Sequence, residues 1–458
     1  MLRSLALVSL IATLAVVMVS GERGASFSSP ADAATATERP SISMRSIVVR
    51  AGSAPALDAV ERLVRAHGGY GVVARNDELL ALAIDLPDGV TLGRAIVALK
   101  LIPGVLYAEP AFHLYKADVP ADPLYVRQAT YLSKVNAPQA WDIETGRPEV
   151  IVAVLDTGID LSHPDLAGRV WQNPSETPNN AADDDGNGCV DDVNGCAFVS
   201  QPSPGCQRAS GGFVHDDVGH GTFVAGIVAA NGNSEGMVGV ARGATVMAVR
   251  VLDCDGAGTS MAVAQGILYA AKNGAKVINV SLGGTNDSSI IREAVRTATN
   301  TYGALIVAAS GNSGKEGVAY PAKYPEVLAV GAASIANPDK RASFSATGPE
   351  VDVVAIGERI IGTVPRTSCQ TFLPCISGQP YAAGNGTSFS TPQVSGLAAL
   401  ILSRRPGTPP GQLLAAIKDT ATAVPDGDRP NWAGEGRINM LEALSPQFRL
   451  GVPGTAKN

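Results

Sequence analysis

The chain has 458 residues, of which 45% are hydrophobic and 17% charged, and 42 acidic against 35 basic residues give a formal charge of −7. This length predicts at least two folding units, and the apolar fraction is large enough for a sizeable core. A net negative charge without a long basic run argues against a nucleic-acid-binding protein.

The N-terminus has the layout of a secretory signal. Arg3 precedes an apolar run over residues 5–19, and the small residues Ser20 and Gly21 follow. We therefore expect residues 1–21 to be a signal peptide and the protein to be secreted. The alternative is an uncleaved membrane anchor, since no Ala-x-Ala cleavage site adjoins the apolar run.

Residues 22–41 are rich in Ser, Ala, Thr and Pro, and we expect a disordered spacer there. Residues 42–116 then carry the signals of a small α+β module of β-α-β-β-α-β type. Its expected strands and helices are residues 46–50, 57–67, 79–84, 92–101 and 105–110. Pro and Asp cluster after it, so residues 117–121 are expected to form an exposed linker that is open to cleavage.

Residues 122–444 alternate strands and helices, as is typical of an α/β domain. Continuous apolar runs predict a mainly parallel sheet that is buried on both faces. The expected strands are residues 150–155, 245–252, 277–282 and 305–309, and the expected helices are residues 261–273 and 290–302. Functional residues should lie just beyond the carboxyl ends of these strands, and a short tail, residues 445–458, follows.

Six cysteines all follow residue 188: Cys189, Cys196, Cys206, Cys254, Cys369 and Cys375. Export makes disulfides permissible. Cys369 and Cys375 flank a short Pro-containing loop and are expected to pair. The other four allow three pairings, among which the sequence does not choose.

Ser388 stands in Gly386-Thr387-Ser388-Phe389-Ser390-Thr391-Pro392, directly before an apolar run that predicts a buried helix. At a helix N-terminus, unpaired backbone N–H groups and the helix dipole favour the anion that forms on an attacked carbonyl. A serine that merely caps a core helix is the simpler interpretation. The other motifs decide between the two.

Asp156 directly follows the first expected strand, and His220 begins a small-residue helix between two glycines. The other histidines are His67 and His113 in the first module and His163 and His215 in expected surface turns. His220 is therefore the candidate base for Ser388, and Asp156 would fix its tautomer. Asp156 alone could equally be a helix cap.

Two further segments end strands. Asn312 follows residues 305–309, where a turn asparagine is the simpler interpretation. Ser281-Leu282-Gly283-Gly284 is either a turn or an exposed edge that pairs with an extended peptide.

Five motifs, in chain order, resemble those of subtilisin-like serine proteases: Asp156-Thr157-Gly158, Gly219-His220-Gly221-Thr222, Ser281-Leu282-Gly283-Gly284, Gly311-Asn312 and Gly386 to Pro392. The resemblance implies a three-layer α/β fold over residues 122–444. It implies Asp156 as orienting acid, His220 as general base and Ser388 as nucleophile. It also implies an oxyanion hole formed by the Asn312 side chain and the Ser388 backbone N–H.

The resemblance has implications for substrate and maturation as well. Ser281-Leu282-Gly283 would bind polypeptide substrates as a strand, and Ala309-Ser310-Gly311 would line part of the first specificity pocket. Residues 42–116 resemble the inhibitory pro-domain that precedes such enzymes and assists their folding. We therefore expect a monomeric zymogen that cuts itself between about Tyr115 and Ala121.

An acidic loop lies between Asp156 and His220. In it, Asp183, Asp185 and Asn187 alternate before Gly188 as at the start of an EF-hand loop, which predicts structural Ca²⁺. The twelfth position, where an EF-hand has a bidentate Glu, is Asn194, so Asp191 or Asp192 would have to compensate. A merely solvated acidic loop is the alternative.

A second calcium site is implied by the resemblance alone. Asp122-Pro123 followed by Ala137-Pro138-Gln139-Ala140-Trp141 is similar to the N-terminus of thermitase-type members, with Asp122 as a ligand. Asp165 and Asn233 stand where its partner ligands are expected.

Three other functions compete with a serine endopeptidase. A catalytically silent binding protein would not need Asp156, His220, Asn312 and Ser388 intact. A sedolisin-type peptidase would have Glu as the base and Asp in the oxyanion role. A calcium-dependent adhesion protein would show repeats or a further C-terminal domain. A histidine base also predicts a neutral-to-alkaline optimum.

Overall fold

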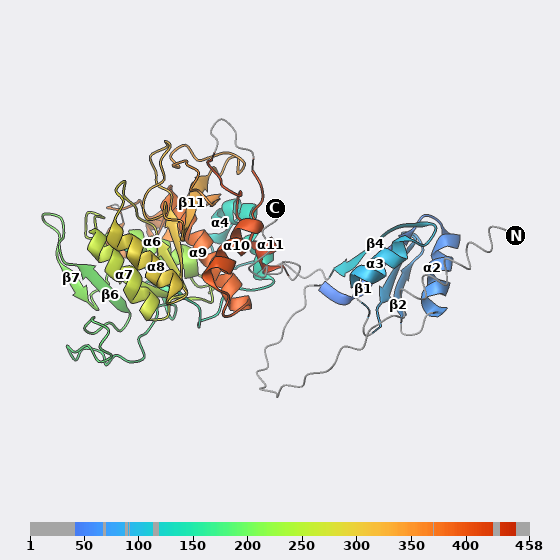
Figure 1. Ribbon diagram of the computed structural model, residues 1–458, viewed down its shortest axis with the longest axis horizontal. Coiled ribbons are helices and arrows are strands. Elements are labelled where there is room, and N and C mark those ends of the chain that lie inside the picture. The colour runs from blue at the N-terminus through green and yellow to red at the C-terminus, as the bar shows by residue number, and fades with distance from the viewer. Residues whose placement is uncertain are drawn as a thin grey trace. The chain divides into compact units, whose positions relative to one another are not determined.

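The computed structural model describes residues 42–66, 70–87, 90, 92–112, 119–369, 371–424 and 431–445 (Figure 1). The expected signal peptide and spacer, residues 117 and 118 of the expected linker, and the tail beyond Ser445 lie outside these ranges. The chain divides into two compact units, Met1–Lys116 and Ala117–Asn458. None of the described helices combines the length and the apolar character that crossing a bilayer requires.

The first unit is an antiparallel sheet with two helices, and its strand order is β2-β3-β1-β4. Its elements are β1 (Ile42–Ala51), α2 (Ala54–Ala66), β2 (Gly71–Asn76), β3 (Ala81–Asp85), α3 (Leu92–Lys100) and β4 (Val105–Phe112). Alternate residues of β1, such as Ile47 and Val49, pack against Leu57 and Val60 of α2 in one apolar core. All the expected elements form. β2 is an additional strand, and its residues are mostly exposed, so it had no apolar pattern to reveal it.

The second unit is built on an eight-stranded sheet of order β12-β11-β10-β9-β5-β8-β6-β7. Its neighbours pair in parallel except β6 and β7. The strands are β5 (Ile151–Asp156), β6 (Gly195–Val199), β7 (Ala209–Gly211), β8 (Thr245–Arg250), β9 (Val277–Val280), β10 (Leu305–Ala309), β11 (Val327–Ala333) and β12 (Val353–Ile356). The expected mainly parallel α/β sheet is confirmed.

Helices cover both faces of this sheet (Figure 1). α7 (Ser260–Lys272) packs beside α8 (Ser289–Asn300), and α6 (His220–Ala229) packs beside α9 (Thr387–Arg404). α9 is buried on nearly every side, as its continuous apolar sequence predicts. The remaining elements are α4 (Tyr125–Leu132), η1 (Ser133–Val135), α5 (Ala137–Trp141), η2 (Pro164–Leu166), β13 (Ile360–Thr363), η3 (Arg366–Ser368), η4 (Ile376–Gly378), β14 (Tyr381–Gly384), α10 (Pro410–Asp419) and α11 (Met440–Leu444).

Two strands end earlier than the apolar pattern predicts, because their last residues turn to other partners. The amides of Val251 and Leu252 donate to the backbone oxygen of Asp156 at 2.9 and 3.1 Å, so β8 ends at Arg250. Beyond β9, Gly284 exchanges backbone hydrogen bonds with Tyr320 instead of extending the sheet. Both departures occur at the carboxyl edge of the sheet, where the candidate catalytic residues lie.

Candidate active site

Asp156 and His220 form a hydrogen-bonded pair at the carboxyl end of the central strand. Asp156 is the last residue of β5 and is fully buried, and His220 is the first residue of α6. The His220 Nδ1 and Asp156 Oδ1 atoms are 2.7 Å apart, and the Thr157 amide donates to the same carboxylate oxygen at 2.8 Å. A carboxylate on Nδ1 holds the proton there and leaves Nε2 of the neutral ring as the acceptor.

A glycine makes this approach possible. A Cβ atom on Gly221 would lie 2.1 Å from the Gly158 oxygen and 3.1 Å from the Asp156 Cβ, so any side chain there would push α6 away from β5. Gly219, which precedes His220, has φ +115°, a backbone conformation that glycine adopts readily. The two glycines around the histidine therefore have a steric role, which fits the pattern from which His220 was selected.

A second buried carboxylate, Asp216, holds the beginning of α6. It accepts from the amides of Val218, Gly219 and Thr222 at 2.8–3.0 Å and from the hydroxyls of Thr157 and Thr222 at 2.8 and 2.6 Å. Asp216 therefore joins the residue after Asp156 to the turn that carries His220. Sequence reasoning missed it, because an Asp beside exposed Asp217 and His215 is typical of a solvated turn.

The two carboxylates also set the protonation of His220. Burial by itself lowers the pKa of the imidazole, but the charge and hydrogen bond of Asp156, with the more distant charge of Asp216, outweigh it and raise the pKa above its ordinary value.

Ser388 is the second residue of α9 and is joined to the end of β9. Its hydroxyl donates to the Ser281 oxygen at 3.1 Å, and the Ser281 hydroxyl donates to the Ser388 oxygen at 2.9 Å. The buried side chain of Asn279 donates to the Ser281 hydroxyl and accepts from Ser395, both at 2.9 Å. Among the described residues no hydrogen bond joins the Ser388 hydroxyl to His220, because the hydroxyl donates to the Ser281 oxygen.

Asn312 lies beside the same helix start. Its side-chain oxygen accepts from the amide and the hydroxyl of Thr387, both at 2.9 Å. The amide nitrogen Nδ2 is therefore free to act as a donor, and it lies 3.7 Å from the point where a Cβ of Gly386 would be. This orientation leaves one side-chain N–H near the Ser388 amide, at the end of a helix where backbone N–H groups have no helical acceptor.

A cleft of about 900 Å³ opens beside His220 and Ser281, while Ser388 and Asn312 are not among the residues that line it. One wall is the loop from Leu252 to Ser260, another is the segment from Ser281 to Ser288, and His220 and Phe372 also line it. Ser281, Leu282 and Gly283 thus lie on the cleft. Ala309 and Ser310 are buried, and Gly311 lies close to the methyl groups of Ala319 and Ala346.

Residues 147–436, more than half of the chain, match the model of the subtilase family. The chain is 39% identical to thermitase from Thermoactinomyces vulgaris over 71% of its own length and 99% of thermitase. The chain belongs to the subtilase family. It is a serine endopeptidase.

Other relatives agree. Subtilisin E from Bacillus subtilis (strain 168) is 36% identical over 76% of this chain and 78% of its own sequence. A protease from Pseudoalteromonas arctica has a similar structure, with a TM-score of 0.59 and 28% identity, over 71% of this chain and 99% of its own. Fervidolysin from Fervidobacterium pennivorans, a keratinolytic enzyme related to subtilisin, has a TM-score of 0.59 and 26% identity over 90% of this chain and 62% of its own.

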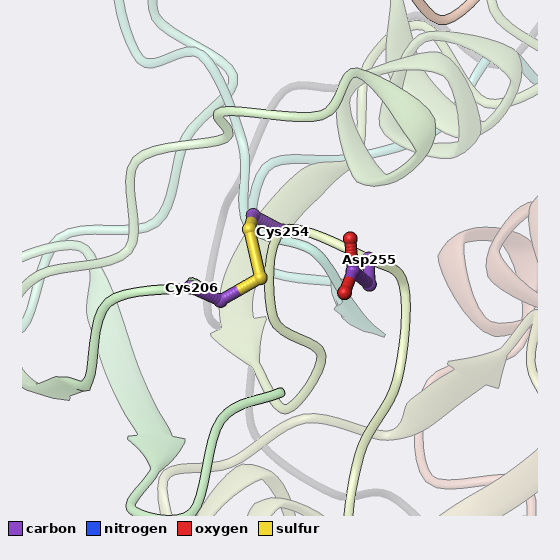
Figure 2. A group of neighbouring side chains, drawn as sticks. All are labelled: Cys206, Cys254 and Asp255. Atoms are coloured by element: carbon purple, nitrogen blue, oxygen red, sulfur yellow. A yellow bond between two sulfur atoms is a disulfide. The ribbon is translucent and has the colours of Figure 1, made fainter. Parts of the chain in front are cut away.

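Three disulfides brace this subtilase: Cys189–Cys196, Cys206–Cys254 and Cys369–Cys375. The expected pairing of Cys369 with Cys375 is confirmed. Cys254 belongs to the cleft wall, so its bond to Cys206 fixes that wall to the segment before β7 (Figure 2). Asp255 lies beside the bond, but neither sulfur is free to act as a thiolate ligand for a metal.

The residues expected at the first calcium site lie in two groups. Asp183, Asp185, Asn187 and Asp192 are joined by hydrogen bonds, because the Asn187 amide group donates to Asp185 and Asp192 at 3.1 and 2.9 Å. Asp191 lies apart from them: its carboxylate accepts the amides of residues 180 and 181. Both oxygens of Asp191 thus accept backbone hydrogen bonds from a turn of the same loop, and its role as a compensating ligand stays a prediction.

Asp122, Asp165 and Asn233 lie together. The Asn233 amide donates to Asp122 Oδ1 at 3.1 Å, while Asp122 Oδ2 and Asp165 Oδ1 are buried and accept no hydrogen bond from described residues. Burial raises the pKa of Asp165 to about 6, against hydrogen bonds that lower it. Two buried carboxylates with unpaired oxygens are what a cation site requires.

One histidine was misjudged. His163 is 1% exposed, and its Nε2 lies 2.9 Å from the Pro380 oxygen, so it is a core residue and not a surface-turn residue. The proline after it suggested a turn, but η2 packs inward.

Proposed function

We propose that Ser388 is the nucleophile of this endopeptidase, that His220 is its general base and that Asp156 orients the imidazole. The observation that carries the proposal is the 2.7 Å contact between His220 Nδ1 and the fully buried Asp156 carboxylate, at a cleft that Ser281 also lines. No other described histidine is both paired with a buried carboxylate and placed on that cleft.

In this reaction the Ser388 oxygen attacks the scissile carbonyl as its proton moves to Nε2 of His220. The imidazolium then gives the proton to the leaving amine, and an acyl-enzyme remains. Water attacks the acyl-enzyme by the same route in reverse. The negative oxygen of each tetrahedral intermediate would accept from Asn312 Nδ2 and from the Ser388 amide. The hydrogen bonds from Thr387 to the Asn312 oxygen support this role, because they leave the nitrogen as the free end.

Polypeptides are the proposed substrates, and they would bind as an extended strand beside Ser281-Leu282-Gly283. β9 leaves the sheet before this segment, and the segment borders the cleft, which supports pairing with another chain there. A Cβ atom on Gly283 would lie 2.9 Å from the Ala319 methyl, so the wall has no room for a side chain at that position. Ala309-Ser310-Gly311 stays a prediction for the first specificity pocket.

We further propose that the enzyme is a secreted, monomeric zymogen. The first unit has its own core, as an inhibitory pro-domain and folding aid should, and the chain passes from it to the second unit after Lys116. Val119, in the expected linker, is 64% exposed, which suits cleavage between about Tyr115 and Ala121. Three disulfides and no free cysteine among the described residues are typical of an oxidising compartment.

Structural Ca²⁺ is proposed at Asp122, Asp165 and Asn233. The unpaired oxygens of the two aspartates fit a hard cation with oxygen ligands, and a bound ion would remove the cost of leaving them buried. This site ties the first turn of the second unit to the segment after α6, so an ion there would stabilise the folded state by mass action.

The test compares the full chain with its Ser388→Ala variant, by N-terminal sequencing of the product and by digestion of denatured casein. The proposal expects the parent to lose everything before about Ala121 and to digest casein, and the variant to stay uncut and inactive. If both proteins behave alike, Ser388 is not the nucleophile, and a binding protein of this fold becomes the better description.

A further inference from the structure

The acidic loop before β6 lacks the ligand that normally completes an EF-hand-like site. Asn194 stands at the twelfth position, and its side-chain amide donates to the Trp171 oxygen at 2.9 Å, so it faces away from the carboxylates. We propose that Glu176, which lies upstream of the loop, supplies the missing carboxylate and completes a Ca²⁺ site with Asp183 and Asp185. This inference rests on the prediction, made from the sequence, that the loop binds calcium.

Glu176 is buried although most of the loop around it is exposed. Its side chain is 8% exposed, and its Oε1 accepts from the Asp184 amide at 2.9 Å. Its Oε2 accepts no hydrogen bond from any described residue. A carboxylate oxygen that is buried without a partner is costly, so the loop as it stands leaves one strong acceptor unused.

Glu176 belongs to a group of three carboxylates. Each of the three side chains places one carboxylate oxygen within 4.8 Å of the other two: Glu176, Asp183 and Asp185. Like charges at this separation repel each other, and a divalent cation between them converts that repulsion into attraction.

The two aspartates are held in place by the backbone of the loop. Asp183 accepts from the amides of Asn187 and Gly188 at 3.0 and 2.8 Å, and Asp185 accepts from the Asn187 amide at 3.0 Å. Their positions therefore do not depend on a cation.

Asp192, the other candidate for the missing ligand, is already engaged. It is fully buried and accepts from the side-chain amides of Asn173 and Asn187 and from the Tyr269 hydroxyl of α7. Its contacts fasten the loop to the helix layer. Glu176 is thus the acid with a free oxygen at the three-carboxylate group.

Oxygen-only ligands of this kind favour Ca²⁺ over zinc or copper, which prefer nitrogen and sulfur. The nearby sulfur of Cys189 is in a disulfide with Cys196 at the start of β6. An ion at Glu176 would therefore close an exposed loop that is anchored at its other end to the central sheet. In a protease that loop is exposed to self-digestion.

The experiment titrates calcium-free Ser388→Ala protein with CaCl₂ in a calorimeter and repeats the titration with Glu176→Gln, Asp165→Asn or Glu149→Gln added. The Gln side chain can still accept from the Asp184 amide, so the fold is retained and only the free carboxylate oxygen is replaced. Exposed Glu149 lies outside the loop and controls for loss of one charge.

We expect Glu176→Gln to weaken calcium binding at the loop site at least tenfold. The site that Asp165→Asn removes should keep its calcium affinity in Glu176→Gln. The same variant should be cut by added subtilisin between residues 173 and 194 in calcium, as the parent is only in EGTA; trypsin has no Lys or Arg to cut after in this segment. If a loop site persists with unchanged affinity in Glu176→Gln, the assignment of Glu176 is wrong. If the parent shows no calcium site other than that of Asp165, the loop binds no calcium. The predicted loop site and the assignment of Glu176 to it then both fail. Neither result bears on Ser388.

Discussion

Asp216 offers a demanding prediction, because its role follows from the structure and not from a motif. In Asp216→Asn the amide nitrogen must replace one carboxylate oxygen. Placed at Oδ2, it leaves the buried Thr222 amide without an acceptor; placed at Oδ1, it leaves the amides of Val218 and Gly219 without one. The better orientation still costs about 1–3 kcal/mol for one unpaired buried N–H.

The charge adds to this cost. A carboxylate at a helix N-terminus contributes about 0.3–1 kcal/mol. We therefore expect Asp216→Asn to lower the free energy of unfolding by about 1–4 kcal/mol, measured by guanidinium denaturation in the Ser388→Ala background to prevent self-digestion. Neighbouring Asp217 is the control for loss of one charge, because it is half exposed and its carboxylate holds no helix turn: it pairs with Arg250 at 3.1 Å and with His215 at 3.8 Å. In Asp217→Asn the side-chain oxygen can still accept from Arg250, so this change should cost less than Asp216→Asn.

The active enzyme gives a second, independent measurement. Asp216 helps to raise the pKa of His220, and the base must be deprotonated to act, so removing this charge lowers that pKa. The acid limb of the kcat/KM profile should therefore move to lower pH in Asp216→Asn and stay in place in Asp217→Asn. An Asp216→Asn protein with the unfolding midpoint and acid limb of Asp217→Asn would refute the reasoning.

Three further outcomes are expected. Asn312→Ala should lower kcat by about 10²–10³ with little change in KM, a magnitude taken from a subtilisin and not worked out from this structure; an unchanged kcat would exclude Asn312 from the oxyanion hole. Replacing Cys206 and Cys254 by Ser should raise KM severalfold for long peptides, because the disulfide no longer holds one wall of the cleft. The kcat for a small ester should stay constant. Equal effects on both substrates would mean a general loss of structure. In the folded protein without calcium, the pKa of Asp165 is about 6, above its value in the unfolded chain. The protonated side chain therefore contributes to stability at low pH, and this contribution is lost as the pH rises through 6. Calcium, in contrast, binds the ionised carboxylate. The gap in Tm between CaCl₂ and EGTA should thus shrink below about pH 6 in Ser388→Ala, and a gap that is constant with pH would contradict this.

The sequence predicted the structure best at positions where only one kind of residue fits, for a steric or a chemical reason. The central strands were predictable because an apolar run buried on both faces has no polar alternation, and four of the eight strands of the large sheet were identified in this way. The glycines around His220 pointed to a close backbone approach, and the collision that a Cβ on Gly221 would meet is its physical basis.

What could not be predicted depends on contacts between distant segments. Asp216 and Glu176 resemble solvated acids in sequence, and only the fold shows that both are buried. Asp191 and Asp192 are adjacent, yet one caps a turn and the other points to α7, a difference that spacing does not reveal. The inward position of His163 is of the same kind. In each case burial, which depends on the whole fold, decides the role of a polar side chain.

The central claim is that His220 activates Ser388, and covalent labelling tests it most directly. The processed enzyme is treated with a fluorophosphonate, whose phosphorus is attacked by the nucleophilic oxygen as fluoride leaves, and the adduct is located by peptide mass mapping. We expect a single adduct on Ser388, a rate that rises with pH through the raised pKa of His220, and a rate lower by several orders of magnitude in His220→Ala. An adduct on another residue, or equal labelling of His220→Ala and the parent, would contradict the account.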